Sequence, residues 1–240
     1  MRKIVEIGEH SIYVPGLQGG GNVIDIGANK GRFSSEVAAK YPVKVISVEA
    51  NPNLAHGLRL NGLTVVECAA GAADGVVEFH IGTNDEASSF RLPSGSNAHL
   101  VVEKTLRIPM KTLGTILKEA GISRSSCVKI DIEGGEIDVL KSVTGIARKI
   151  SPQWTVEFHD DQEFQLCKSS EVDAAIATFK FDGFSVLVRN WPSRTNVLFL
   201  DRSALGISWL EWMLLVLRYQ YVAVFWRIIT RTKARFMAYF

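Results

Sequence analysis

Residues 22–31 read NVIDIGANKG, an apolar and β-branched run that ends in a turn with two glycines. The run at 22–26 is typical of a strand that is buried on both faces of a sheet. The glycines that follow let the backbone turn sharply and let a ligand approach it closely. Residues 127–136, CVKIDIEGGE, show the same order of an apolar run, carboxylates and glycines. Both stretches predict a strand that turns into a helix, the repeating unit of an open, mainly parallel sheet.

Short apolar runs alternate with helical stretches along most of the chain. The expected strands are residues 22–26, 43–48, 63–68, 76–81, 127–132, 154–158, 184–189 and 196–200. The expected helices are residues 33–40, 52–61, 110–120, 136–143 and 171–179. The strand at 76–81 alternates in polarity, so we expect it at an edge of the sheet. This order predicts an α/β fold with a doubly wound sheet, whose ligands bind beyond the C-terminal ends of the strands.

The turn after the first strand discriminates between two nucleotide ligands. A dinucleotide needs the pattern G-x-G-x-x-G, because its second glycine makes room for the pyrophosphate. Asn29 and Arg32 stand where the second and third glycines would be if the pattern began at Gly27. S-adenosylmethionine has no phosphate and needs a carboxylate near its ammonium or sulfonium group, which Asp25 can supply. The turn therefore favours S-adenosylmethionine, and a plain strand-to-helix turn is the alternative.

Two more expected strands end in residues that suit the same ligand. Glu49 closes the second strand, near the separation of ~20 residues at which an acid accepts hydrogen bonds from ribose hydroxyls. Cys68-Ala69-Ala70-Gly71 closes the third, and its small side chains would let an adenine ring lie against the loop. A solvated cap at Glu49 and a tight turn at Ala70 are the alternatives.

Four groups of residues at these strand ends carry a family resemblance. They are DIGANKGRFS at 25–34, VEANP at 48–52, KIDIEGGE at 129–136 with VLK at 139–141, and VEFH at 156–159. Together they resemble the FkbM-type S-adenosylmethionine-dependent methyltransferases over about residues 12–199. Gly135 and Ala50 depart from that family, which usually has alanine and proline there.

The resemblance implies a class I, Rossmann-like methyltransferase fold. Its mainly parallel sheet would have seven strands, with an antiparallel strand inserted by the hairpin at 184–200. It also implies methylation of a hydroxyl, often on a sugar, a glycan or glycolipid, or a polyketide-type product. The residues expected to bind S-adenosylmethionine are Asp25, Gly27, Ala28, Asn29, Gly31, Glu49, Ala70 and Asp131.

Methyl transfer to an alcohol needs an oriented acceptor and a base for one proton. His159 is the expected base, because its unperturbed pKa is ~6.5. Asp131 and Glu133 are the other expected catalytic residues. Both lie with Lys129 on one side of their strand, since side chains alternate along a strand.

Alternatives stay open for several of these side chains. His159 could be an ordinary loop histidine, and Glu136 could simply cap the helix that follows it. Asp131, Glu157 and His159 together would suit Mg²⁺, but their spacing is not diagnostic and we expect no metal. The remaining histidines have no carboxylate partner that the sequence predicts: His10, His56, His80 and His99. The polar stretch at 82–97 is expected to form a loop over the site.

Composition places the chain among globular proteins of one domain with an appendage. It has 240 residues, of which 47% are hydrophobic and 22% charged, and its formal net charge is only +2. These values exclude a disordered chain and give no reason to expect nucleic acid as a partner. Three widely separated cysteines predict reduced thiols in the cytoplasm. The N-terminus has no long apolar run, so no signal peptide is expected.

Residues 202–240 form an expected helical tail that differs from the methyltransferase domain at 1–201. The tail has six basic residues and one acid, and it holds three of the five tryptophans. Its longest uncharged run, residues 219–226, is shorter than the ~20 residues that a spanning helix needs. We expect residues 205–240 to lie on a membrane surface, to form a homodimer or another protein interface, or to pack on the domain. The first case would place the protein at the inner membrane surface.

Two other functions compete with methyl transfer. A nicotinamide-dependent oxidoreductase could use a similar sheet, but the missing glycines at 29 and 32 count against it. A non-catalytic cofactor-binding module could keep the fold, but the acids at 131, 133 and 136 count against that. The acceptor, a small molecule or a glycan, is not predicted further, because pocket walls select it and the fold does not.

Overall fold

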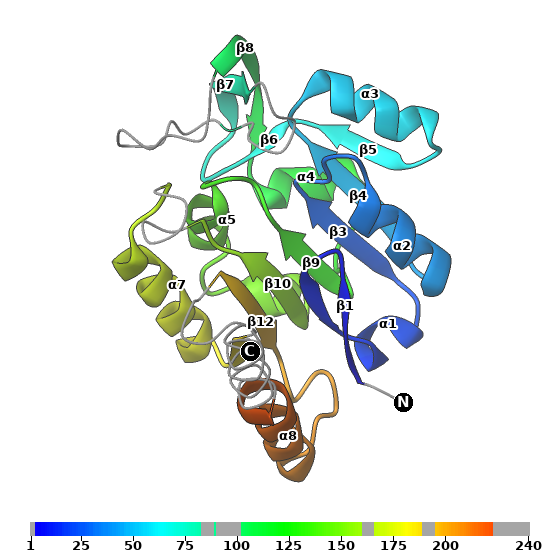
Figure 1. Ribbon diagram of the computed structural model, residues 1–240, viewed down its shortest axis with the longest axis vertical. Helices are drawn as coiled ribbons and strands as arrows, with labels where there is room; N and C mark the ends of the chain where they lie inside the picture. The colour runs from blue at the N-terminus through cyan, green and yellow to red at the C-terminus, as the bar shows by residue number, and fades with distance from the viewer. Residues whose placement is uncertain (1–2, 83–88, 90–101, 160–165, 189–194, 223–240) are drawn as a thin grey trace, which may run out of the picture.

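The computed structural model describes residues 3–82, 89, 102–159, 166–188 and 195–222 (Figure 1). The strands are β1 (Ile4–Ile7), β2 (His10–Tyr13), β3 (Asn22–Ile26), β4 (Lys44–Glu49), β5 (Thr64–Glu67), β6 (Ala69–Ala70), β7 (Gly75–Gly82), β8 (Val102–Lys111), β9 (Cys127–Ile130), β10 (Gln153–Glu157), β11 (Ser185–Val188) and β12 (Asn196–Leu200). The helices are α1 (Pro15–Gln18), α2 (Arg32–Lys40), α3 (Pro52–Leu60), α4 (Leu113–Glu119), α5 (Glu136–Ser142), α6 (Ala147–Ile150), α7 (Ser169–Phe181) and α8 (Trp209–Val216), which a π-helical turn (Leu217–Val222) extends.

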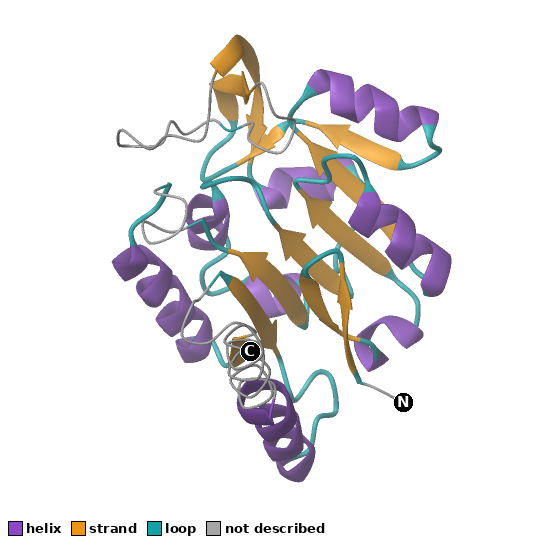
Figure 2. Cartoon of the chain, viewed as in Figure 1, coloured by secondary structure: helices purple, strands orange, loops and turns teal. Residues whose placement is uncertain are grey.

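The central sheet has seven strands in the order β11-β12-β10-β9-β3-β4-β5. The strands from β10 to β5 are mutually parallel, and β12 lies antiparallel between β10 and β11. Helices cover both faces of the sheet (Figure 2). The predicted α/β class, the seven strands and the antiparallel insertion by the last hairpin are confirmed.

Strands β3 and β9 are neighbours in the middle of the sheet, where apolar side chains are buried on both faces. Ile24, Val128 and Ile130 are fully buried in the main core. The register pairs Ile26 with Ile130 on one side and with Val48 on the other. The C-terminal ends of β3, β4 and β9 therefore meet at one edge, and the loops after them converge there.

Residues 76–81 form an edge strand, as predicted, but this strand is not part of the central sheet. They belong to β7, which lies in a separate three-stranded sheet of order β6-β8-β7. The long strand β8, which was not predicted, pairs antiparallel with β7 along its length and gives it this second sheet. Helix α4 consequently begins later than expected, after β8 ends. The Thr112 hydroxyl caps this helix by accepting a hydrogen bond from the Thr115 N–H at 3.2 Å.

The hairpin of β1 and β2 was also not predicted. All four residues of β2 are buried, and β2 packs against β10 and β12. Strand β2 begins at His10, which the hairpin places beside the carboxyl ends of the central strands.

The tail begins on the body of the protein. The Ser208 hydroxyl caps α8 by accepting from the Glu211 N–H at 3.2 Å. Trp212, Leu215 and Val216 pack against a small core formed with β11 and β12. Within the described part of the chain, no helix has both the length and the apolar character needed to cross a membrane. The domain boundary at 201/202 and the cytoplasmic location stay predictions.

Candidate active site

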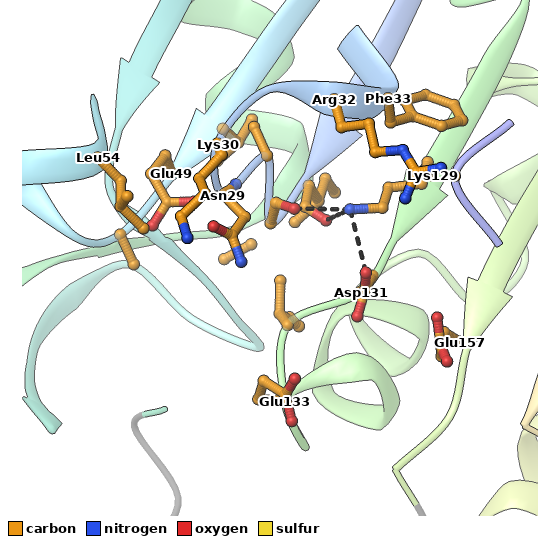
Figure 3. Close-up of a pocket in the computed structure, with 18 of the residues that line it drawn as sticks. Asn29, Lys30, Arg32, Phe33, Glu49, Leu54, Lys129, Asp131, Glu133 and Glu157 are labelled. Carbon is orange, nitrogen blue, oxygen red and sulfur yellow. Dashed lines mark hydrogen bonds and ion pairs between the residues drawn. The ribbon is translucent and has the colours of Figure 1, made fainter. Parts of the chain in front are cut away.

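A cavity of about 500 Å³ lies at the edge where the strand ends converge (Figure 3). The loops after β3, β4, β9 and β10 line it, together with β6 and the turn between β1 and β2. The lining residues with functional side chains include Glu9, His10, Asn29, Glu49, Lys129, Asp131, Glu133, Glu157 and His159. This is the position at which ligands bind in open parallel sheets.

Gly27 fixes the floor of the cavity. Its φ is +80°, and a Cβ built on it would lie 1.8 Å from the Asp131 carbonyl oxygen. The Gly27 and Ala28 N–H groups both donate to the Val48 carbonyl, at 2.9 and 3.1 Å. The loop after β3 is therefore pressed against the ends of β4 and β9, with no space for a side chain.

Gly27→Ala is expected to destabilise the protein by about 1–3 kcal/mol more than Gly62→Ala. The two glycines have nearly the same φ, +80° and +79°, but nothing lies within 4 Å of a Cβ at Gly62. The control therefore carries the backbone strain without the collision. Urea unfolding of both variants measures the difference, and equal losses would show that the loop moves freely away from β9.

Glu49 organises the loop at the opposite side of the floor. One carboxylate oxygen accepts from the Asn29 N–H at 2.7 Å, and the other accepts from the Asn51 N–H at 2.8 Å. Burial raises the pKa of Glu49, and these two hydrogen bonds oppose the rise. Each oxygen keeps a further lone pair, so the carboxylate can still accept hydrogen bonds from a ligand.

Asn29 adds a second acceptor to this end of the cavity. Its Oδ1 is buried and has no hydrogen-bond partner among the described residues, and the residue lines the cavity. A buried acceptor without a partner is costly. Glu49, Asn29 and the small residues Ala69 and Ala70 therefore fit a ligand that presents hydroxyl or ammonium donors and a flat ring.

Asp25 and Gly31, both predicted to bind the cofactor, are not among the residues that line the cavity. Asp25 is fully buried beneath it. Its carboxylate accepts from the Ser34 hydroxyl at 2.6 Å and lies 3.1 Å from the Lys129 ammonium. Gly31, with φ +78°, precedes α2 and is packed against Leu58 and Leu63. Both residues support the cavity from below.

Lys129 joins the floor to the acidic end of the cavity. Its ammonium donates to the Gly27 carbonyl at 2.6 Å and lies 3.4 Å from Asp131 (Figure 3). Burial alone would lower the pKa of Lys129, but Asp25 and Asp131 raise it. Lys129 and His10 in turn hold the pKa of Asp131 well below its usual range, against the effect of burial. Asp131 is therefore an ionised, weakly basic carboxylate.

Two histidines flank this acidic end. His10 Nε2 lies 3.3 Å from Asp131 and 3.8 Å from Glu157. His159 Nδ1 lies 2.8 Å from Glu136, and its Nε2 lies 3.4 Å from Glu133. Both rings are almost fully buried. The side chains thus form one connected network of imidazoles and carboxylates.

The pKa of His159, the residue expected to be the base, is shifted in this network. Burial lowers the pKa of His159, but Glu136, Glu133 and Asp131 together raise it to about 10. His159 is therefore an imidazolium at neutral pH and already carries the proton that a base would take. Burial and neighbouring carboxylates raise the pKa of Glu133 to about 7, and they raise that of Glu157 equally.

Backbone strain gathers at the same cavity. Among the described residues, the non-glycine residues with positive φ are Glu9, Asn29 and Glu133, at +27°, +49° and +55°. All three line the cavity. Such conformations cost of order 1–3 kcal/mol each and cluster at functional sites. The Ser89 hydroxyl donates to the Glu133 carbonyl at 2.6 Å and so helps to hold that strained residue.

Sequence reasoning missed His10 and gave no role to Lys129. The partners of His10 are more than a hundred positions away in sequence, and no local pattern indicates them. A lysine inside an otherwise apolar strand, CVKI, was the available signal for Lys129. Apart from Ser89, the loop expected over the site lies largely outside the described residues.

Two groups of these side chains lie close enough to share one ion. They are His10, Asp131 and Glu157, and Asp131, Glu133 and His159. Asp131 belongs to both groups, and the Lys129 ammonium already lies beside it. The expectation that no metal is needed stays a prediction.

The sequence is similar to known methyltransferases. The methyltransferase FkbM domain family matches residues 25–186. Methyltransferase sdnD of Sordaria araneosa is 25% identical over an alignment of 170 residues, and the match covers 56% of this chain and 65% of that protein. The chain thus spans just under two thirds of the length of this relative.

The chain is also similar to solved structures at low sequence identity. Methyltransferase FkbM from Methylobacillus flagellatus KT has 16% identity and a TM-score of 0.47, over 75% of this chain and 43% of that chain. Aeropyrum pernix fibrillarin, in complex with S-adenosyl-L-methionine, has 10% identity and a TM-score of 0.42, over 78% of this chain and 68% of that chain.

Proposed function

Since the chain belongs to the FkbM methyltransferase family, we propose that it methylates a hydroxyl group of a sugar, a glycan or glycolipid, or a polyketide-type acceptor. S-adenosylmethionine is the cofactor of this methyltransferase domain. The observation that carries the proposal is one cavity with two chemically different ends. Glu49 and Asn29 offer hydrogen-bond acceptors at one end, and a network of carboxylates and imidazoles occupies the other.

The Glu49 end suits the nucleoside part of the cofactor. The free lone pairs of Glu49 would accept from ribose hydroxyls, as an acid at the end of this strand does in related folds. Ala69 and Ala70 leave a flat apolar surface beside it. When bound, S-adenosylmethionine supplies an activated methyl group. The protein then has to orient the acceptor and accept one proton.

We assign to Glu133 the role of the base that accepts the proton from the acceptor hydroxyl. It lies in the cavity apart from the Lys129–Asp131 ion pair (Figure 3). With its pKa raised to about 7, it is both partly ionised at neutral pH and basic enough to take a proton. Asp131 is too weak a base, and His159 is already protonated. The His159 imidazolium, 3.4 Å from Glu133, orients this carboxylate.

The pH dependence of kcat/KM is expected to be bell-shaped. The acid limb should rise through about 7, because Glu133 becomes a base only as it loses its proton. The alkaline limb should fall near pH 10, where His159 loses the charge that orients Glu133. Glu133→Gln should lower kcat by about 10²- to 10⁴-fold and remove the acid limb.

Glu157→Gln is the matched control for this profile. Glu157 lines the same cavity and has the same raised pKa, about 7. If Glu157→Gln keeps both the acid limb and most of kcat, the result supports Glu133 as the base. If Glu157→Gln loses the limb and Glu133→Gln keeps it, the assignment passes to Glu157.

The nicotinamide alternative loses its support with the family match. The binding-module alternative is tested by turnover itself.

The protein should be incubated with a methyl-labelled donor and panels of sugar, glycolipid and polyketide acceptors, and the product masses measured by mass spectrometry. A gain of one methyl group at an acceptor oxygen supports the proposal. Binding of the donor without turnover on any panel, or transfer only to nitrogen or carbon, would contradict it.

A further inference from the structure

Helix α8 presents an apolar face to solvent. Trp209 and Leu210 are 67% and 65% exposed, and Met213, Leu214 and Leu217 continue the same face. The opposite face is also apolar, but Trp212, Leu215 and Val216 are partly buried against the body. A helix that is apolar all round is normally enclosed by protein or lipid. On α8, the outer half has no such cover among the described residues.

The polar groups of α8 all serve its inner side. Glu211 is its charged residue, and its carboxylate accepts from the Lys3 ammonium and the Tyr13 hydroxyl, each at 2.7 Å. Tyr219, in the turn that extends the helix, contacts Ser11 through the two hydroxyls. These contacts fix which face points outward. The outer face therefore holds large apolar side chains without a charge among them.

The charge of the following segment selects between possible partners. After Glu211 the sequence contains no acid up to Phe240, but it contains Arg218, Arg227, Arg231, Lys233 and Arg235. In a symmetric dimer the same patch meets its own copy, so the exposed Arg218 that follows the face would meet and repel its counterpart. An anionic lipid surface would accept both the apolar face and the basic residues.

We propose that the outer face of α8 is a membrane-docking surface, and that its partner is a bilayer surface that contains anionic lipids. The helix lies along the interface, with Trp209, Leu210 and Leu214 at the boundary between headgroups and acyl chains and the exposed Arg218 toward the anionic headgroups. No residue of α8 lines the cavity, so docking and methyl transfer are separable properties. The proposal does not depend on the identity of the acceptor.

Vesicle co-sedimentation of the full chain tests this surface. The native protein should bind vesicles of phosphatidylcholine with phosphatidylglycerol, and bind pure phosphatidylcholine at least about tenfold more weakly. Added salt should weaken the binding, since it screens the charges. The double variant Leu210→Glu/Leu214→Glu should lose at least about tenfold of the affinity for anionic vesicles.

The matched control is Leu60→Glu/Phe181→Glu. Both residues are large, apolar and strongly exposed, on α3 and α7 respectively, so the control adds the same charge away from α8. It should bind vesicles as the native protein does. Thermal unfolding and S-adenosylhomocysteine binding check that both variants are folded.

Several outcomes would overturn the proposal. Absence of vesicle binding, equal binding to neutral and anionic vesicles, or binding that survives Leu210→Glu/Leu214→Glu would each do so. Light scattering after gel filtration could give a further contradicting outcome. A native dimer that Leu210→Glu/Leu214→Glu converts to monomer would assign the face to a second copy of the chain.

Discussion

Glu49→Ala is expected to weaken the binding of S-adenosylhomocysteine, the spent cofactor, by about 100-fold or more. Hydrogen bonds to a charged group contribute about 1.5–3 kcal/mol each, and the variant loses those that Glu49 can offer to the ribose. It also leaves the Asn29 and Asn51 N–H groups without their acceptor. The loop that forms the floor of the cavity would then lose its fixed shape. Isothermal titration calorimetry of both proteins measures the difference directly.

Glu67→Ala is the control for this experiment. Glu67 pairs with Glu49 in the register of β4 and β5, but it is exposed and forms an ion pair with Arg59 at 2.7 Å. The substitution also removes a glutamate carboxylate, but on the neighbouring strand and at a position outside the cavity. Its affinity for S-adenosylhomocysteine should equal that of the native protein. Unchanged affinity in Glu49→Ala would mean that Glu49 does not bind the cofactor.

Lys129→Met is expected to lower the free energy of unfolding by about 3–5 kcal/mol. The ammonium is almost fully buried between Asp25 and Asp131, at 3.1 and 3.4 Å. Methionine fills a similar volume but leaves the fully buried Asp25 carboxylate without a counter-charge and leaves Asp131 with its histidine neighbours alone. It also removes the donor to the Gly27 carbonyl, which ties the loop after β3 to β9. Urea denaturation monitored by tryptophan fluorescence gives the change.

Lys44→Met separates this effect from a general loss of a charged strand residue. Lys44 lies at the exposed start of β4, two strands away from β9 in the same sheet. Its replacement should change stability by no more than about 0.5 kcal/mol. If both variants are equally stable, the ion pairs of Lys129 do not hold the floor of the cavity together.

The central strands could be predicted because the apolar residues within each strand already indicate that it is buried. Val23, Ile24 and Ile26 form an apolar run that only Asp25 interrupts, and such runs occur where a strand is buried on both faces. The same reasoning located β9, β10 and β12. It failed for β8, because four of its ten residues are charged and it also contains a proline, which is rare inside strands. Strand β7 was then assigned to the wrong sheet, because its true partner was unknown.

The candidate site could be predicted in part. Glu49, Asp131 and Glu133 were identified because each follows a predictable strand, and all three line the cavity. The environment of His159 could not be predicted, because its pKa depends on Glu136, which lies on a helix after a different strand. His10 was missed for a similar reason, since the hairpin that carries it has no strong apolar pattern. Spacing along a chain thus locates strand ends, but charge networks depend on contacts between distant segments.

The most direct test of the account is a crystal structure of the protein with S-adenosylhomocysteine. The account predicts ligand density in the cavity of Figure 3, with ribose hydroxyls on the Glu49 carboxylate and the sulfur toward Asp131 and Glu133. A ligand bound elsewhere, or a cavity that takes up a nicotinamide dinucleotide in place of S-adenosylhomocysteine, would contradict it.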